Sequence, residues 1–298
     1  TKLPRDRGSI NHVQQGQGIE YYPIINQHYS KGLRGEKKMK REIAKDEVNI
    51  INFSGGRTSA YMAKRLIDEG LENYIVAFEN TGKEMKQTLD FINECDNRWN
   101  LNIVWLEYRY GNNFEVVNYE TASRNGRPFD ELIAYKKGTL PNTMMRFCTE
   151  QLKINTLKRW AKSIGIKEWN HYVGIRYDEP RRYGKTSMLP KYMTTEHPLV
   201  KWKTTKKDVL DFWKEQEFDL MVNEPYGNCD GCFLKGKGKL SIIAKEKPEL
   251  FDWWIDKEKQ SGNTFKKEIT YQLLKDKSIT QKGLFDGDPS FDCFCNTD

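Results

Sequence analysis

One sequence feature constrains the fold of this chain most. It is an apolar stretch followed by a glycine-rich turn and then by a helical pattern. The stretch is VNIINFSGGRTSAYMAKRL, residues 48–66. VNIINF is a short apolar run bounded by turn residues, which is typical of a buried strand in a parallel sheet. After the turn, Tyr61, Met62, Leu66 and Ile67 repeat at helical spacing. The pattern therefore predicts a strand, a tight turn and a helix in direct succession.

Such a turn collects backbone N–H groups and the positive end of a helix at one point, an arrangement that suits a phosphate. Gly55 and Gly56 permit positive φ angles and a close backbone approach, and Arg57 adds a positive charge. Hydroxyl donors come from Ser54, Thr58 and Ser59. The GxxxxGK[ST] spacing of a Walker A loop is absent. An ordinary Ser-capped helix after a strand is the alternative interpretation of this turn alone.

The following residues repeat the alternation. Residues 74–78 (YIVAF) and 102–108 (NIVWLEY) have the composition of strands, and residues 84–99 between them have a helical pattern. This order predicts an α/β fold with a doubly wound, mostly parallel, Rossmann-like sheet, whose ligand crevice lies beyond the carboxyl ends of its strands. SGGRTS and NTG (residues 80–82) would both lie there. A further strand pattern in residues 170–183 ends in a polar group, namely Gly174, Arg176, Asp178, Glu179, Arg181 and Arg182.

Five motifs in this order resemble the phosphoadenosine phosphosulfate (PAPS) reductase family, within the adenine-nucleotide α-hydrolase superfamily of ATP pyrophosphatases. They are SGGRTS, NTG, RFCTEQLK (146–153), GIRYDEPRR (174–182) and HPLVKW followed by EPYGNCDGC (197–232). The resemblance covers about residues 48–235. It implies that an adenine nucleotide, ATP or PAPS, is held by Ser54, Gly55, Gly56, Arg57, Thr58, Ser59, Thr81, Gly82, Gly174, Arg176 and Arg182. It further implies catalytic roles for Arg57, Arg176 and Glu179, because an in-line displacement at phosphate develops charge that fixed cations offset. Arg181 is expected to be a surface residue.

The six cysteines fall into two groups. Cys95 shares a helical face with Met85, Leu89, Ile92 and Trp99, so a buried apolar role is expected. Cys148 lies in RFCTEQ, Cys229 and Cys232 form a C-x-x-C, and Cys293 and Cys295 lie near the end of the sequence. Four thiolates suit a 4Fe–4S cluster or tetrahedral zinc. Branches of the superfamily resembled carry a 4Fe–4S cluster, which implies Cys148, Cys229, Cys232 and Cys295 (or Cys293) as ligands; structural zinc and free thiols are the alternatives.

Two departures from the reductases favour ATP chemistry. The E-C-G-L-H segment that supplies the family's nucleophilic cysteine is absent, and the intact SGG-x-TS loop is more typical of members that split ATP to AMP and pyrophosphate. The leading expectation is an enzyme that adenylates an acceptor, with nucleic acid as the first candidate acceptor, and delivers sulfur with an iron–sulfur cluster. The alternatives are a PAPS or adenylylsulfate reductase with a thioredoxin-like donor, and a non-catalytic nucleotide-binding subunit of a phage or defence system. A partner protein is also compatible with the pattern.

Charge and composition set the expected domain organisation. Residues 1–41 hold nine Lys or Arg against three acidic residues, so they carry +6 of the chain's net +7. We expect residues 1–46 to be a basic arm, or an extension that is not part of the natural protein. Residues 47–200 would form the nucleotide-binding domain and residues 201–298 a helical subdomain that bears the cluster cysteines. No apolar run is long enough to span a bilayer, and the cysteine usage is typical of a reducing cytoplasmic setting.

Overall fold

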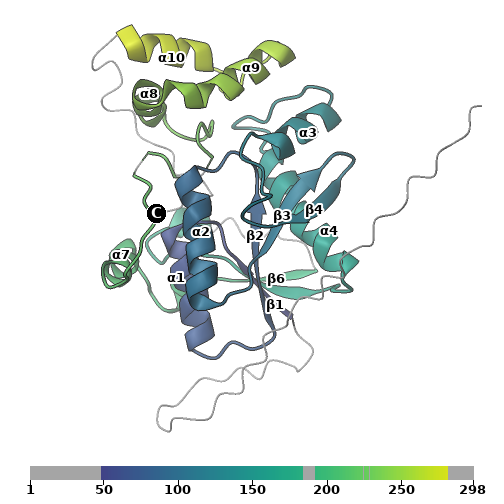
Figure 1. Ribbon diagram of the computed structural model, residues 1–298, viewed down its shortest axis with the longest axis vertical. Helices are drawn as coiled ribbons and strands as arrows, with labels where there is room; N and C mark the ends of the chain where they lie inside the picture. The colour runs from purple at the N-terminus through teal and green to yellow at the C-terminus, as the bar shows by residue number, and fades with distance from the viewer. Residues whose placement is uncertain (1–47, 184–191, 224, 228, 281–298) are drawn as a thin grey trace, which may run out of the picture.

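A six-stranded sheet forms the centre of the computed structural model, which describes residues 48–183, 192–223, 225–227 and 229–280 (Figure 1). The strands are β1 (Val48–Asn52), β2 (Tyr74–Asn80), β3 (Val104–Arg109), β4 (Asn113–Val117), β5 (Trp169–Tyr172) and β6 (Met193–Glu196). Their order in the sheet is β4-β3-β2-β1-β5-β6, and every neighbouring pair is parallel except β3 and β4. The predicted fold class is therefore confirmed.

Apolar layers cover both faces of this sheet. The side chains of β2 are buried along its whole length, as expected for a central strand in a parallel sheet. Ile51, Val76 and Phe78 belong to the apolar cluster on one face, whereas Ile50 and Ile75 belong to the cluster on the other face. This alternation follows from the two-residue period of a strand.

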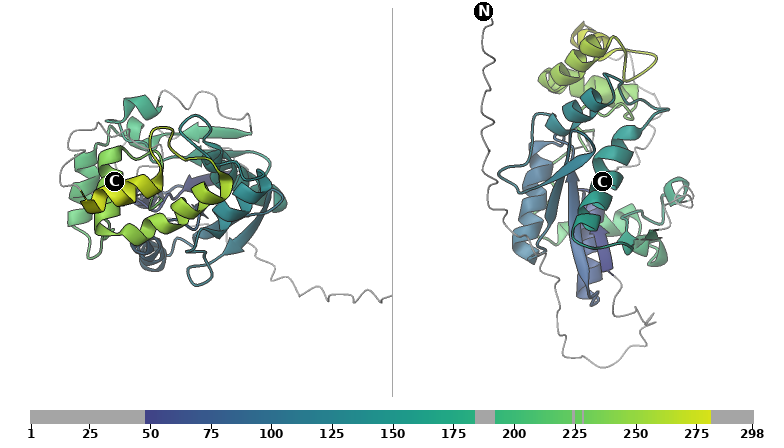
Figure 2. Two further views of the ribbon diagram at one scale, coloured as in Figure 1. Left: turned by 90° about the horizontal axis from the view of Figure 1, so that it is seen from above. Right: turned by 90° about the vertical axis from the view of Figure 1, so that its right-hand side faces the viewer.

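Helices pack on each face of the sheet (Figure 2). The first cluster is covered by α1 (Arg57–Asp68), α2 (Lys86–Trp99) and α7 (Lys206–Lys214). The opposite face is covered by α4 (Asn155–Ser163), which contacts β2, β3 and β4 and continues directly from the π-helix η1 (Thr149–Ile154). Short helices α5 (Pro180–Tyr183) and α6 (Pro198–Lys201) flank β6.

A second helical layer lies beyond the carboxyl edge of the sheet (Figure 1). It contains α8 (Lys237–Glu246), the 3-10 helix η3 (Pro248–Phe251), α9 (Asp252–Ser261) and α10 (Tyr271–Thr280), which share an apolar cluster with α3 (Arg127–Tyr135). None of the helices in the described ranges is long and apolar enough to cross a membrane.

The sequence patterns located most elements but misjudged several boundaries. Residues 239–260 have one continuous helical pattern in the sequence, but the structure interrupts it at Pro248, because proline lacks the N–H that a continuous helix requires. The edge strands β4 and β6 were not predicted; the side chains of β4 are exposed or half-buried, so its apolar signal is weak. Residues 1–47 and 281–298 lie outside the described residues. The predicted domain division stays a prediction; α7 packs with α1, on the sheet domain.

Candidate functional site

The turn after β1 requires glycine at residue 55, the first of its two glycines. Gly55 has a φ of 83°, in the left-handed region that side-chain-bearing residues rarely adopt. A Cβ atom at this position would lie 2.7 Å from Cγ2 of Thr88 on α2. Gly56, in contrast, is extended, with a φ of −106°, and precedes the first residue of α1. The close packing of α2 against Gly55 therefore fixes the path of the backbone at the start of the turn.

Serine hydroxyls close the turn on itself. Oγ of Ser59 accepts hydrogen bonds from the backbone N of Ser54 at 3.1 Å and from its Oγ at 3.0 Å. The Ser59 hydroxyl in turn donates to the carbonyl of Gly56 at 3.0 Å. No side chain caps the N-terminus of α1, and its first turn holds no acidic residue. The N-terminus of a helix without such groups among the described residues is suited to an anion, so the phosphate-binding role of this turn stays a prediction.

The segment after β5 contacts this turn. A Cβ atom at Gly174 would lie 3.2 Å from Cα of Ser59, so glycine permits the two backbones to approach closely. Arg176 is only 5% exposed, and its Nη1 donates to Oγ1 of Thr58 at 3.2 Å. The fold therefore brings Gly174 and Arg176 to the Ser54–Ser59 turn, more than 110 residues away in sequence.

Carboxylates hold the two arginines of this segment. Nε of Arg176 donates to Asp178 at 3.0 Å, and its backbone N donates to Glu179 at 3.0 Å. Nη1 of Arg182 donates to Glu179 at 2.6 Å. Glu179 thus links Arg176 and Arg182, whereas Arg181 is exposed, as expected for a surface residue. The catalytic roles of Arg176 and Glu179 stay predictions.

The guanidinium of Arg57 contacts a carboxylate, whereas the sequence suggested a phosphate as its partner. Its guanidinium donates to both carboxylate oxygens of Asp219, at 2.6 and 2.8 Å, and to the carbonyl of Leu220. Trp213 donates its indole N–H to the carbonyl of Arg57 at 3.1 Å. These contacts tie the start of α1 to α7 and to the segment that follows it. Direct action of Arg57 on a phosphate stays a prediction, and its observed contacts are structural.

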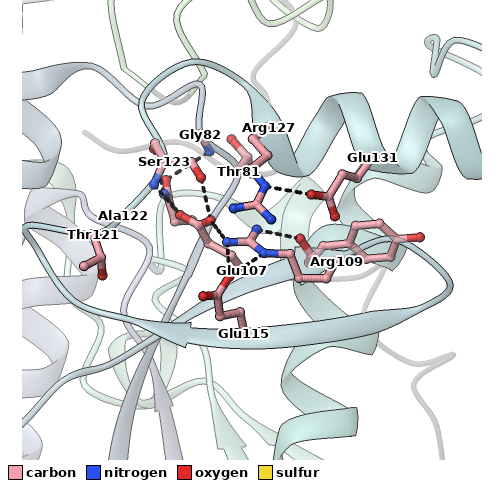
Figure 3. A network of polar contacts seen from close by, with 12 residues as sticks. Thr81, Gly82, Glu107, Arg109, Glu115, Thr121, Ala122, Ser123, Arg127 and Glu131 are labelled. Atoms are coloured by element: carbon pink, nitrogen blue, oxygen red, sulfur yellow. Dashed lines mark hydrogen bonds and ion pairs between the residues drawn. The ribbon is translucent and has the colours of Figure 1, made fainter. Parts of the chain in front are cut away.

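The loop after β2 is held by a buried polar network (Figure 3). The carboxylate of Glu107 on β3 is fully buried and accepts from Asn80, from the backbone N and hydroxyl of Ser123, and from Arg109, at 2.6 to 2.7 Å. Asn80 accepts in turn from the backbone N of Gly82 at 3.0 Å. Gly82 has a φ of 75°. The predicted nucleotide-pocket residues Thr81 and Gly82 therefore occupy a rigid loop at the carboxyl edge of the sheet.

Three predicted metal ligands line one small cavity of about 30 Å³ beside this loop. Its walls include the thiols Cys148, Cys229 and Cys232, together with Thr81 and Lys153. Oγ1 of Thr81 lies 3.5 Å from Sγ of Cys229. Apolar side chains complete the cavity, among them Phe129, Leu152, Phe233 and Trp254. We refer to it as the thiol cavity.

Buried ionic and hydrogen-bond contacts position the C-x-x-C loop. Asp230 forms an ion pair with Lys83 at 2.8 Å, and both side chains are less than 10% exposed. Asp230 also accepts from Nε1 of Trp254 at 2.8 Å, while the carbonyl of Gly231 accepts from the hydroxyl of Tyr271. A Cβ at Gly231 would overlap the indole of Trp254. Trp254 is accordingly a core residue.

The thiol groups are suitable metal ligands, but three of them line the cavity, whereas the expected metal centre needs four. Thiolate is a suitable ligand for zinc and for iron–sulfur clusters, and three cysteines line one cavity. Within the described residues, no group of three or more His, Cys, Asp or Glu side chains has the geometry of a metal site. The expected fourth ligand, Cys293 or Cys295, lies outside the described residues. Cys95 is fully buried in the first apolar cluster, as predicted.

Two buried carboxylates beside Lys153 were not anticipated from the sequence. Burial raises the pKa of Glu79 to about 8, and the positive charge of Lys153 opposes this rise. Burial also raises the pKa of Glu84, against Lys153 and hydrogen bonds from Thr81. Oε1 of Glu79 has no hydrogen-bond partner in the part of the chain that the structure describes. The sequence signal that could have indicated Glu79 is a charged residue at the end of a buried strand, as in YIVAFEN.

Comparisons with known proteins identify distant relatives. No family model matches the chain. It is 28% identical over 223 residues to an uncharacterized nin region protein of Escherichia phage lambda, covering 68% of this chain and 71% of that protein. It is 24% identical over 237 residues to an uncharacterized protein of Methanocaldococcus jannaschii, covering 74% of this chain and half of that protein. A crystal structure of PAPS reductase from Candida auris, in complex with phosphate, is similar at a TM-score of 0.38 and 15% identity, over 57% of this chain and 73% of that one. A similarity at that TM-score carries no argument about activity.

Proposed function

We propose that the chain is an enzyme that binds ATP at the Ser54–Ser59 turn and splits it into AMP and pyrophosphate to activate an acceptor for sulfur transfer. The observation that carries this proposal is the approach of Gly174 and Arg176 to that turn. An uncapped helix N-terminus, several hydroxyls and a buried arginine beside one turn suit a polyphosphate.

In the proposed reaction, an acceptor oxygen attacks the α-phosphorus of ATP and pyrophosphate leaves, so that the acceptor oxygen carries AMP. A sulfur nucleophile then displaces AMP from the acceptor. The N–H groups of the first turn of α1 and the hydroxyls of Ser54 and Thr58 would hold the phosphates. Arg176, oriented by Asp178 and Glu179, would offset the negative charge that develops in the displacement. Arg57 would act as a positioning residue, through Asp219.

The thiol cavity would hold the sulfur chemistry. Cys148, Cys229 and Cys232, with Cys293 or Cys295, are the residues that we propose as ligands of a 4Fe–4S cluster, and zinc is the alternative. Such a cluster, when bound, can supply sulfide or electrons beside the nucleotide site. Lys83 and Asp230 would keep the C-x-x-C loop in place, and Lys153 would contribute positive charge to the cavity wall.

The test of nucleotide cleavage is a product analysis with ATP. We expect AMP and pyrophosphate to form in equal amounts in the presence of the acceptor, and Arg176→Ala to lower the rate on the order of 100-fold. Arg181→Ala is the matched control, because it removes the same charge from an exposed position five residues away, and its rate should match that of the wild type. Equal rates for the two variants would contradict the assigned role of Arg176. Release of sulfite from PAPS would favour a sulfonucleotide reductase instead.

The metal is tested separately, by iron, zinc and acid-labile sulfide analysis of protein purified without oxygen. About four irons per chain, lost in Cys229→Ser, would support the cluster. Stoichiometric zinc without iron would make the C-x-x-C site structural and contradict the sulfur-transfer step.

A further inference from the structure

A cavity of about 430 Å³ lies at the amino edge of the sheet, opposite to the Ser54–Ser59 turn. It is lined by Tyr74, the first residue of β2, by Val104, the first residue of β3, and by Val117, the last residue of the antiparallel strand β4. The turn, in contrast, follows the carboxyl end of β1. The volume is within the range of about 300–1,000 Å³ that small-molecule sites occupy. We refer to this site as the amino-edge cavity.

Helix α2 and two loops form the walls of the amino-edge cavity. Asn93, Asp96 and Asn97 of α2 line it, and their i, i+3 and i+4 spacing places them on one side of the helix. The loops contribute Leu101, Asn102 and Ile103 before β3, and Asn118, Tyr119 and Glu120 after β4. Apolar residues of the strands, Val76 and Trp105 among them, complete the lining. The cavity therefore combines polar groups of α2 and the loops with apolar residues of the sheet.

The lining carries negative charge. Asp96 and Glu120 are its charged residues, and no Lys or Arg belongs to it. Neither carboxylate forms an ion pair with any residue that the structure describes. Arg124 lies over the ring of Tyr119, 5.0 Å from its centroid, but it donates its hydrogen bonds to the carbonyl groups of Tyr119 and Ala122. Within the described ranges, the two carboxylates thus have no paired cation.

The polar side chains of α2 in this lining would stabilise a bound cation. A carboxylate oxygen of Asp96 accepts from the backbone N of Ile103 at 3.1 Å. Burial nevertheless raises the pKa of Asp96, against this hydrogen bond and one from the backbone N of Asn102. A cation in the cavity would offset the hydration that this carboxylate loses on folding. The side chains of Asn93 and Asn97 form no hydrogen bond with any described residue, so their amide oxygens can accept from a ligand.

Other classes of ligand match this lining less well. The two carboxylates would repel an anion. A neutral sugar would leave both carboxylates without a counter-charge. A metal ion needs more donors, and the described part of the chain contains no group of three or more His, Cys, Asp or Glu side chains that could hold one. Ammonium groups on an apolar carbon chain match both the charge of the carboxylates and the apolar residues of the sheet.

We propose that the amino-edge cavity binds a short aliphatic polyamine. Two of its ammonium groups would pair with Asp96 and Glu120, and further N–H groups would donate to the amide oxygens of Asn93 and Asn97. The methylene chain would lie against Ile103 and the other apolar residues of the lining. This site is separate from the Ser54–Ser59 turn and from the thiol cavity, so the inference does not depend on the proposed function.

The experiment is calorimetric titration of the full chain with spermidine at low and at high salt. We expect one saturable site per chain, with an affinity that falls as salt screens the ion pairs. Putrescine, which has two ammonium groups, should bind more weakly than spermidine, and butylamine, which has one, should bind more weakly still. Glucose and inorganic phosphate should not compete with spermidine.

The test variant is Asp96→Asn/Glu120→Gln, in which each side chain keeps its shape and one acceptor oxygen. Because burial disfavours the charged form of Asp96, the neutral amide should not destabilise the fold. The matched control is Asp256→Asn/Glu268→Gln, which removes the same charge from two exposed positions in and after α9. We expect the affinity for spermidine to fall on the order of tenfold in the test variant and to stay within about twofold of the wild type in the control.

A change of size without a change of charge completes the test. Asn97 is an exposed residue of the lining, so Asn97→Trp should fold normally, fill part of the cavity and weaken spermidine binding several-fold. Thermal unfolding of the variant checks that the fold is retained. Absence of saturable binding, equal losses in the test and control variants, equal affinities for butylamine and spermidine, or displacement of spermidine by Mg²⁺ at constant ionic strength would each overturn the proposal.

Discussion

The Ser54–Ser59 turn and the thiol cavity are neighbours at the carboxyl edge of the sheet, but they are built in different ways. The turn consists of six consecutive residues, held by the serine hydroxyls within it and by the packing of α2. The cavity draws its thiols from Cys148, directly before η1, and from a loop some 80 residues later, and a buried ion pair anchors that loop. A substitution in the turn should therefore affect mainly the turn itself. A substitution in the ion pair that anchors the C-x-x-C loop should lower the free energy of unfolding of the whole chain.

The largest effect is expected from Asp230→Ala. This change leaves the ammonium group of Lys83 buried without its carboxylate, which should lower the free energy of unfolding by about 3–5 kcal/mol. Urea denaturation measures the loss, and the double variant Lys83→Met/Asp230→Ala should recover most of it. A loss of less than about 1 kcal/mol, on the scale of an exposed pair, would show that the ion pair does not anchor the loop.

Gly55→Ala should have the next largest effect, and it concerns the turn. A methyl group there combines a positive φ with a 2.7 Å contact to Thr88, so we expect about 1–3 kcal/mol of destabilisation. Gly70→Ala is the matched control, because Gly70 has nearly the same φ, 84°, with no atom within 4 Å of the added Cβ. The difference in unfolding free energy between the two variants, measured by thermal or urea unfolding, isolates the steric contribution of the contact with Thr88. Equal losses in the two variants would mean that α2 does not constrain the turn.

The third prediction is a pH dependence that originates beside the cavity. The folded pKa of Glu79, about 8, lies above the ordinary glutamate value of 4.5, so folding favours the protonated form. Its contribution to stability is fully present below pH 4.5 and is lost as the pH rises through 8, by at most about 1.4 kcal/mol per pH unit. Unfolding free energies measured from pH 5 to 9 should fall less steeply in Glu79→Gln than in the wild type. Identical slopes would place the titrating group elsewhere.

The smallest effect is expected from Lys64→Ala, on the same helix as the turn. The Lys64–Asp68 pair is exposed, so its loss should change the free energy of unfolding by less than about 0.5 kcal/mol. The affinity for ATP should be unaltered. A larger change in either quantity would show that α1 transmits surface changes to the turn, against the local character that we assign to it.

The same contrast explains how much the sequence alone could predict. The Ser54–Ser59 turn, the parallel strands β1, β2, β3 and β5, and α2 were predictable, because hydrophobic period and glycine position are local signals. The grouping of Cys148 with the C-x-x-C pair was proposed from a resemblance, and the structure brings these residues to one cavity. The partner of Arg57 and the ion pair of Lys83 with Asp230 could not be read from the chain, because they join segments about 150 residues apart.

Calorimetric titration with ATP tests most directly whether the Ser54–Ser59 turn holds an adenine nucleotide. The account predicts saturable binding of one ATP per chain, weakened on the order of tenfold or more in Gly55→Ala and unchanged in Gly70→Ala. Absence of saturable binding, or equal affinity in all three proteins, would contradict it.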